Sequence, residues 1–365
     1  MQGGAHRFSF RTTGLVALLV LLAGPWHVAL AACPKLLMFD GVDYRSQTTA
    51  EQAAYWGQTV GMQGFFLKNV MDNWKEDVGT DPQSALWQNV AKFQSTYAPS
   101  GVTDNFIKVA LYKPHDWNNK KANDAVITRF KHAAMLAKYA KLKGVALDLE
   151  PYTPTWGGPA AGPELATTIE QEGRAIGQAM HDAYPDMTLF ILPDVMDQTQ
   201  AYATLLQRIK SGVHKLKAGK KVPPYDRYEL AVPFVKGLLS VAWSHVAIGM
   251  EQTYSRYAQG MQPSVQRTEG DYAQLMGKSA ASMNLTAAPG LWPLGPTKTD
   301  KSKREKPAKF EGRLEAAYAA ASQYVWIYGH GSAWQTDGPY ARGPVTSDFN
   351  QFTDAVHRVE TSCRK

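Results

Sequence analysis

Cysteine is scarce in this sequence, with only two among 365 residues, and no histidine pair has a spacing typical of metal ligands. Without a Cys-rich cluster or a His-x-x-x-His pair, the sequence predicts no metal site. No Gly-x-Gly-x-x-Gly or Gly-x-x-x-x-Gly-Lys loop follows an apolar run, so no nucleotide or other cofactor is expected. The segment "GHGSAW" around Ser332 lacks the form Gly-x-Ser-x-Gly, which argues against a serine hydrolase.

Long apolar runs are absent after residue 32. Within residues 1–32, Arg7 and Arg11 precede the apolar core "GLVALLVLLAG" and the small-residue sequence "ALAA". This pattern is typical of a secretory signal peptide and is short for a membrane span. We therefore expect a mature domain, residues 33–365, that is secreted or periplasmic. The whole sequence has a formal net charge of +7, which is only mildly basic, so no nucleic acid partner is expected.

The two cysteines, Cys33 and Cys363, stand at the two ends of the predicted mature chain. "LAAC" ending at Cys33 also matches a lipoprotein cleavage box, in which this cysteine would carry a lipid anchor. A lipid would leave Cys363 as a free thiol in an oxidising compartment, and strand-like "KLLMFDG" follows with no flexible tether. A Cys33–Cys363 disulfide uses both residues, so we favour it over the lipid.

Short apolar runs of strand character alternate with amphipathic helical patterns along the mature chain. The eight runs cover residues 35–41, 62–69, 106–113, 144–150, 188–194, 245–251, 289–294 and 324–331. Helical patterns between them include residues 49–61, 123–144, 164–185 and 310–323. This alternation predicts a single (β/α)8 TIM barrel, with a doubly wound open sheet as the alternative. A barrel also brings its first and last elements, and hence the two cysteines, close together.

Two basic segments, residues 208–229 and 295–311, are rich in Lys, Gly or Pro and predict loop insertions. A solvated loop is the usual structure of such a charge run. Attraction for an anionic polymer at the mouth of the site is the alternative.

The fourth run, "GVALDLE", carries two acids on one face of the predicted strand. Side chains alternate along a strand, so Ala146, Asp148 and Glu150 share the face opposite Val145 and Leu147. If the apolar face packs against the helices, both acids point into the barrel, with Glu150 at its carboxyl-terminal rim. This rim is where TIM-barrel enzymes hold their catalytic residues.

The form Asp-x-Glu at the end of the fourth barrel strand resembles the catalytic motif of family-18 chitinases, and family-25 lysozymes carry a similar pair. The layout, including the closing "YVWIYGHGSAW", is also similar to that of secreted glycoside hydrolases. This resemblance implies that Glu150 is the proton donor, and that Asp148 orients the substrate and tunes Glu150. The chain departs from the chitinase pattern at Ala146, where a further aspartate is usual, and at "GMEQTY", where Met-x-Tyr-Asp is usual.

A second catalytic carboxylate is expected from another strand, because Asp148 and Glu150 approach a bond from the same side and cannot flank it. Glu251 is the leading candidate as nucleophile or base, since the sixth run places Ala247, Gly249 and Glu251 on one face. Three further acids at or beyond strand ends are candidate substrate-binding residues: Asp40, Asp116 and Asp194. A capping or loop-bonding role is the alternative for each of them.

Aromatic and basic residues near the same strand ends are further candidates for binding sugar rings or hydroxyl groups. They are Lys113, Tyr152, Trp156, Tyr254, Trp292, Trp326, His330 and Trp334. A place in the core or a bond to a loop carbonyl is the alternative.

Together these features predict a secreted glycoside hydrolase that cleaves a carbohydrate polymer or glycoconjugate by carboxylic general acid catalysis. A barrel that binds carbohydrate without cutting it is the main alternative, and an envelope protein that keeps only the scaffold is another. Cutting is favoured because a lectin does not need paired inward acids.

Overall fold

The structure is a computed structural model that describes most of the chain after residue 32. The described residues are 33–39, 41–150, 155–156, 162, 164–210, 228–255, 258–293, 305–329 and 349–365. The predicted signal peptide and most of both basic segments lie outside them. No helix among the described residues has the length and apolar character that crossing a membrane requires.

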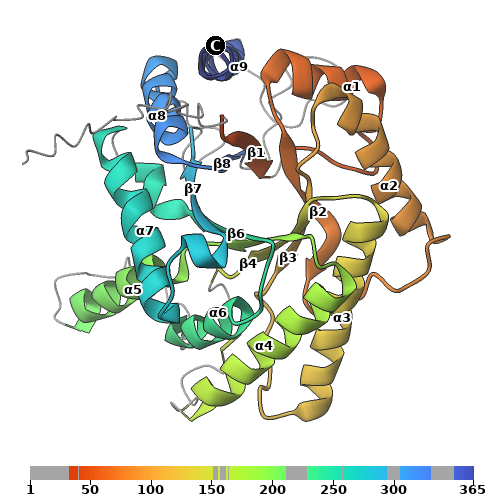
Figure 1. Ribbon diagram of the computed structural model, residues 1–365, viewed down its shortest axis with the longest axis vertical. Helices are drawn as coiled ribbons and strands as arrows, with labels where there is room; N and C mark the ends of the chain where they lie inside the picture. Colours follow the sequence, from red (N-terminus) through yellow and green to blue (C-terminus); the bar gives the residue numbers. More distant parts are fainter. Residues whose placement is uncertain are drawn as a thin grey trace, which may run out of the picture. The chain divides into compact units, whose positions relative to one another are not determined.

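Eight parallel strands close into a barrel in which each strand pairs with its neighbour in the chain and β8 pairs with β1 (Figure 1). The strands are β1 (Lys35–Phe39), β2 (Gly64–Asn73), β3 (Phe106–Ala110), β4 (Gly144–Asp148), β5 (Thr188–Leu192), β6 (His245–Met250), β7 (Leu285–Leu291) and β8 (Tyr324–Tyr328). The predicted (β/α)8 TIM barrel is therefore confirmed, and the doubly wound alternative is wrong.

Helices surround the strands, and α9 lies between α8 and α1 (Figure 1). Their bounds are α1 (Ala50–Ala54), α2 (Ala85–Tyr97), α3 (Lys120–Tyr139), α4 (Leu165–Ala183), α5 (Val195–Lys210), α6 (Ala231–Leu239), α7 (Met261–Met276), α8 (Pro307–Ala320) and α9 (Phe349–Cys363). Several begin at side chains that cap the first turn: Thr49 forms a capping box, and Ser84 and Asn119 accept backbone N–H groups.

The strands separate two apolar layers. Residues that face outward, such as Val145, Leu147 and Ile248, pack with the buried faces of the helices. Residues that face inward fill the barrel with aromatic and small side chains: Leu37, Phe66, Phe106, Ala146, Phe190, Leu192, Ala247, Ala288, Tyr324 and Trp326. These described residues make the interior a packed core, as is usual in such barrels, where ligands bind at the rim.

Most strands end one to three residues before the predicted runs do, and two strand boundaries differ from the prediction by four residues. β7 begins at Leu285, four residues before the predicted start at residue 289, because small residues "TAA" continue the strand into the "PGL" segment. β2 extends to Asn73, beyond the predicted end at residue 69, with register shifts against β3 after Leu67 and a left-handed Asn69 (φ 62°). An irregular strand of this kind loses the strict alternation on which sequence prediction relies.

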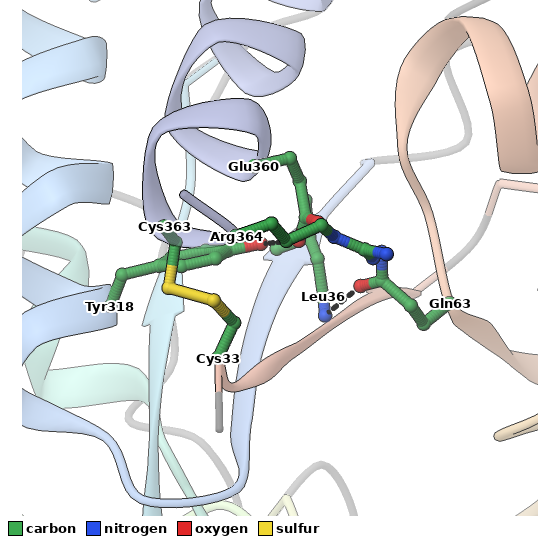
Figure 2. Close-up of a disulfide and its surroundings, with 7 residues drawn as sticks. All are labelled: Cys33, Leu36, Gln63, Tyr318, Glu360, Cys363 and Arg364. Atoms are coloured by element: carbon green, nitrogen blue, oxygen red, sulfur yellow. Dashed lines mark hydrogen bonds and ion pairs between the residues drawn. A yellow bond between two sulfur atoms is a disulfide. The ribbon is translucent and has the colours of Figure 1, made fainter. Parts of the chain in front are cut away.

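The predicted disulfide joins Cys33, just before β1, to Cys363, the last residue of α9 (Figure 2). The Cα atoms of the two cysteines are 5.9 Å apart, although 330 residues separate them in the chain. The bond uses the Cys33 sulfur that a lipid anchor would need. It fastens α9 to the end of the barrel where the strands begin, which we call the base.

Candidate active site

Three carboxylic side chains from two strands line one cavity at the opposite end, the carboxyl-terminal rim. Asp148 is the last residue of β4, Glu150 follows two residues later, and Glu251 begins the short helix η5 (Glu251–Ser255) directly after β6. All three line a cavity of about 260 Å³. The structure therefore brings together the three residues that the sequence predicts as catalytic.

Five aromatic rings line the same cavity: Phe39, Tyr254, Trp292, Trp326 and Tyr328. The ring centroids of Tyr254 and Tyr328 are 6.4 Å apart with planes 18° from parallel. The Trp292 centroid is 5.5 Å from each of these two rings. Flat apolar walls beside a few polar groups are typical of a small-molecule site, and pyranose rings stack on such faces.

Trp326 is almost fully buried and lies against β7. Its indole N–H donates to the Ala288 carbonyl at 3.0 Å. A Cβ at Gly290 would lie 2.7 Å from the Trp326 ring, so only glycine lets the indole approach this strand. The expectation that Trp326 and Tyr254 border the site agrees with the cavity lining, and their contact with substrate stays a prediction.

A lysine that the sequence analysis missed lies beside the acids. The Lys108 ammonium on β3 is 3.9 Å from the Asp148 carboxylate and 5.4 Å from the centroid of the Phe39 ring. Both partners of this ion pair are largely buried, so it is less screened by solvent than a surface pair. Lys108 holds a positive charge at the Asp148 side of the cavity.

Glu251 has a different environment. Burial and the neighbouring carboxylates of Glu150 and Asp148 raise the pKa of Glu251 well above its ordinary value. No Lys, Arg or His side chain of the described residues forms an ion pair with Glu251. Its carboxyl group is therefore favoured in the protonated form, which is the form that a general acid needs.

The loop that carries Glu251 and Tyr254 is fixed from behind by a buried arginine. Arg313 on α8 donates to the carbonyl groups of Thr253 and Tyr254 at 2.7 and 3.0 Å, and to both oxygens of Glu305 at 2.8 Å. The Thr253 hydroxyl accepts the backbone N–H of Gly290 at 2.8 Å, and its single proton is shared between the Met250 and Gly290 carbonyls, at 2.6 and 2.8 Å. These bonds hold η5 in one position relative to β6 and β7.

Asp194 is a correction to the predicted set of substrate-binding residues. It is 1% exposed, and one carboxylate oxygen accepts the backbone N–H groups of Met196 and Asp197 at the start of α5. The other accepts from Gln252 and Thr268, each at 2.8 Å. Asp194 therefore caps a helix and braces the loop at Gln252, which is the alternative weighed for such acids.

Trp156 is a second correction. The side chain is fully buried, and its ring stacks on Trp117 with centroids 5.6 Å apart and planes 2° from parallel. Phe234 packs against it at 5.3 Å. These contacts leave no ring face for a sugar, so Trp156 belongs to the core.

Lys113 and Asp116 are exposed and lie away from the carboxylate cavity. Asp116 accepts the backbone N–H of Asn118 at 3.1 Å, a bond typical of a turn, and it borders a separate surface groove beside α3. Neither Lys113 nor Asp116 is therefore part of the lining of the carboxylate cavity. Four further predicted residues lie outside the described residues: Asp40, Tyr152, His330 and Trp334.

Four residues at the site were not selected from the sequence: Phe39, Lys108, Leu192 and Tyr328. A usable signal existed for Phe39, Tyr328 and Lys108. Phe39 follows Leu37 by two residues, and Tyr328 follows Trp326 by two, so strand alternation places both on an inward face. Lys108 follows Phe106 in the same way, and a lysine on an inward face is itself unusual.

Neither a family model nor a curated protein matches this sequence. A solved glucosidase from Croceicoccus marinus is 10% identical with a TM-score of 0.54, over 92% of this chain and 68% of that one. A GH18 chitinase from Pseudoalteromonas aurantia is 10% identical with a TM-score of 0.44, over 88% and 99%. A sugar phosphate isomerase/epimerase from Parabacteroides distasonis is 11% identical with a TM-score of 0.41, over 91% and 97%. At such identities the likeness is one of fold alone.

Proposed function

We propose that the protein is a secreted glycoside hydrolase that cleaves a carbohydrate polymer or glycoconjugate. The observation that carries this proposal is the meeting of Asp148, Glu150 and Glu251 in an aromatic-lined cavity at the barrel rim. The predicted signal peptide and the Cys33–Cys363 disulfide support an oxidising compartment outside the cytoplasm.

Cleavage of a glycosidic bond needs one protonated carboxyl group and one carboxylate. The raised pKa of Glu251 supports it as the acid, with its proton passing to the glycosidic oxygen while the bond to the anomeric carbon breaks. Glu150, on a different strand, then serves as the ionised partner, and water supplies the hydroxyl group of the new reducing end. In the sequence analysis, Glu150 was the expected proton donor and Glu251 the expected nucleophile or base. This proposal exchanges these two roles.

Asp148 and Lys108 form an ion pair beside Glu150 and Glu251, and we assign Asp148 a role in orienting the substrate. The Lys108 ammonium keeps a positive charge beside Asp148. A carboxylate that faces a cation favours its ionised form, which lets Asp148 orient a hydroxyl or ring substituent of the substrate.

The test is release of reducing ends from a panel of polysaccharides, peptidoglycan included, by the purified mature protein and by Glu150→Gln. We expect release from one substrate class and its loss in Glu150→Gln, with folding and sugar binding retained. Unchanged release by Glu150→Gln would refute the catalytic assignment. Tight binding of one glycan with no release by either protein would instead favour the carbohydrate-binding barrel.

A further inference from the structure

The lining of the cavity carries acidic groups and no basic group among the described residues. It contains Asp148, Glu150 and Glu251, and Lys108 adds a single positive charge behind Asp148. Burial is the largest cause of the raised pKa of Glu251, and the carboxylates of Glu150 and Asp148 raise it further. Burial and the three acidic groups likewise raise the pKa of Tyr254, so further negative charge is disfavoured in this cavity. A ligand that brings a positive charge would instead be favoured there.

Beside the acids, three of the aromatic rings that line the cavity pack against one another. Tyr254 and Tyr328 lie nearly parallel, and Trp292 is inclined to them by 56° and 53°. Ring faces attract cations within about 6 Å of the ring centroid, and rings grouped around one space recognise ammonium groups. Carboxylates and ring faces in one cavity therefore favour a cation over a neutral group of the same size.

We propose that the sugar bound in this cavity is an amino sugar with a free, protonated amine, as in a polymer of de-N-acetylated hexosamine. This inference deepens the proposed function by naming its substrate class, and in that respect rests on it. A uronic acid or sulfated sugar would instead place a negative charge among three acidic side chains. A neutral sugar can stack on the rings but gains nothing from the charge.

The inference also concerns the two basic segments of the sequence. An anionic polymer was the alternative expected from residues 208–229 and 295–311, which lie mostly outside the described residues. The cavity has the opposite charge preference, so these segments are not expected to select the sugar at the site.

Glu251→Gln is the suitable protein for a binding test, because glutamine is neutral like the protonated Glu251 side chain and removes the proton donor. Calorimetry at mildly acidic pH would compare tetramers of glucosamine and galactosamine with their fully N-acetylated counterparts and with a neutral glucose tetramer. We expect one free-amine tetramer to bind at least about tenfold tighter than its N-acetylated counterpart. The preference should fall as salt is raised, because salt screens the charges.

Ring removal supplies the second measurement. Trp292→Leu, made in the Glu251→Gln protein, should reduce the preference for the free amine severalfold. Tyr139→Leu is the matched control, because Tyr139 lies on α3 and is the exposed large aromatic of the described residues, at 40%. It should leave the preference unchanged.

The outcomes separate this inference from the proposed function. Equal or tighter binding of N-acetylated or neutral tetramers, or no binding of free-amine tetramers, overturns the inference. If the wild-type protein still releases reducing ends from a neutral polymer, the proposed function stands alone. If free-amine tetramers bind with preference but the wild-type protein cleaves none, the ligand class stands and the hydrolase assignment is wrong.

Discussion

Buried acids at the two ends of the barrel have opposite environments. At the base, Asp104 is 2% exposed and its carboxylate accepts bonds from Lys35 at 2.6 Å, Thr103 at 2.7 Å and Tyr324 at 2.9 Å. These partners come from β1, the segment before β3, and β8. The acid therefore links three elements at the point where the barrel closes.

Glu360 is a second buried acid at the base, and it too has hydrogen-bond donors as neighbours; it lies beside the disulfide (Figure 2). Its carboxylate accepts a short hydrogen bond from the Tyr318 hydroxyl and forms an ion pair with Arg364, with 2.9 Å between Arg364 Nε and Glu360 Oε2. Burial, together with the charge of Glu360 and the hydrogen bond to it, raises the pKa of Tyr318 well above its ordinary value, so the hydroxyl keeps its proton. This acid fastens α9 to α8.

At the rim, by contrast, Glu251 has two carboxylates as neighbours and no described cation as a partner. A buried acid among like charges costs stability, and such sites in clefts are frequently functional. Burial of an acid therefore does not by itself indicate its role. The sign of the charges around it distinguishes an acid that links structural elements from a candidate proton donor.

The largest expected effect is on catalysis at the rim. Glu251→Gln should lower kcat by about 10²–10⁴, since the glutamine cannot give a proton to the leaving group. Steady-state rates on the substrate found in the polysaccharide panel measure this. Asp104→Asn, the same kind of change at the base, should leave kcat per folded molecule unchanged, and comparable losses in both variants would remove the contrast between the ends.

Replacing Arg313 tests whether the loop that carries Glu251 depends on the buried ion pair between Arg313 and Glu305. Arg313→Gln should lower the free energy of unfolding by about 3 kcal/mol, because it removes the buried cation at 2.8 Å from the buried Glu305 carboxylate and leaves the more exposed Lys309 at 3.8 Å. It should lower kcat as well, by releasing the loop that carries Glu251. Denaturant unfolding and rate measurements check the two parts.

The matched control for Arg313 is Arg358→Gln. Arg358 pairs with Glu311 at 2.7 Å, also on α8, but the arginine is more than half exposed. Its replacement should change stability much less than Arg313→Gln does and leave kcat unchanged. A loss as large as that of Arg313→Gln would show that burial is not what distinguishes the two pairs.

Asp104→Asn should lower the free energy of unfolding by about 2 kcal/mol, because the charge-assisted bond to Lys35 and the acceptor for Thr103 are weakened in a buried place. Chemical denaturation at neutral pH measures this. A variant as stable as the wild type would mean that the base does not depend on its paired acids.

The smallest expected effect is the pH dependence of stability at Glu251. Its folded pKa lies above the unfolded value of about 4.3, so the wild-type protein loses stability as pH rises from that value toward the folded pKa. Glu251→Gln lacks this loss and should therefore be more stable than the wild type at neutral pH. Unfolding curves at several pH values would show the gap widening, and a constant gap would contradict the raised pKa.

The fold was predictable because its signals are local. A period of two in "GVALDLE" and "HVAIGME", and helical patterns between such runs, follow from strand and helix geometry over a few residues. Inward placement of Ala146 and Ala247 could therefore be predicted correctly. β2 was predicted less well, since its irregular stretch at Asn69 interrupts the alternation.

The selection of site residues was only partly predictable. Trp156 and Trp292 are equally plausible as stacking residues in the sequence, yet Trp117 and Phe234 bury the first while the second borders the cavity. Asp194 likewise follows β5 by two residues, as Glu150 follows β4. Its helix-capping role depends on where α5 begins and on Gln252 and Thr268 from later in the chain.

The sequence by itself determined the eight strands, the inward faces that carry Asp148, Glu150 and Glu251, and the pair of cysteines that the fold joins. Only the tertiary structure decided that β4 and β6 place their acids in one cavity with Tyr328, and that Lys108 forms an ion pair with Asp148. The reason is physical: side-chain direction is fixed by local backbone geometry, whereas a pKa depends on charges that barrel closure brings within a few ångströms.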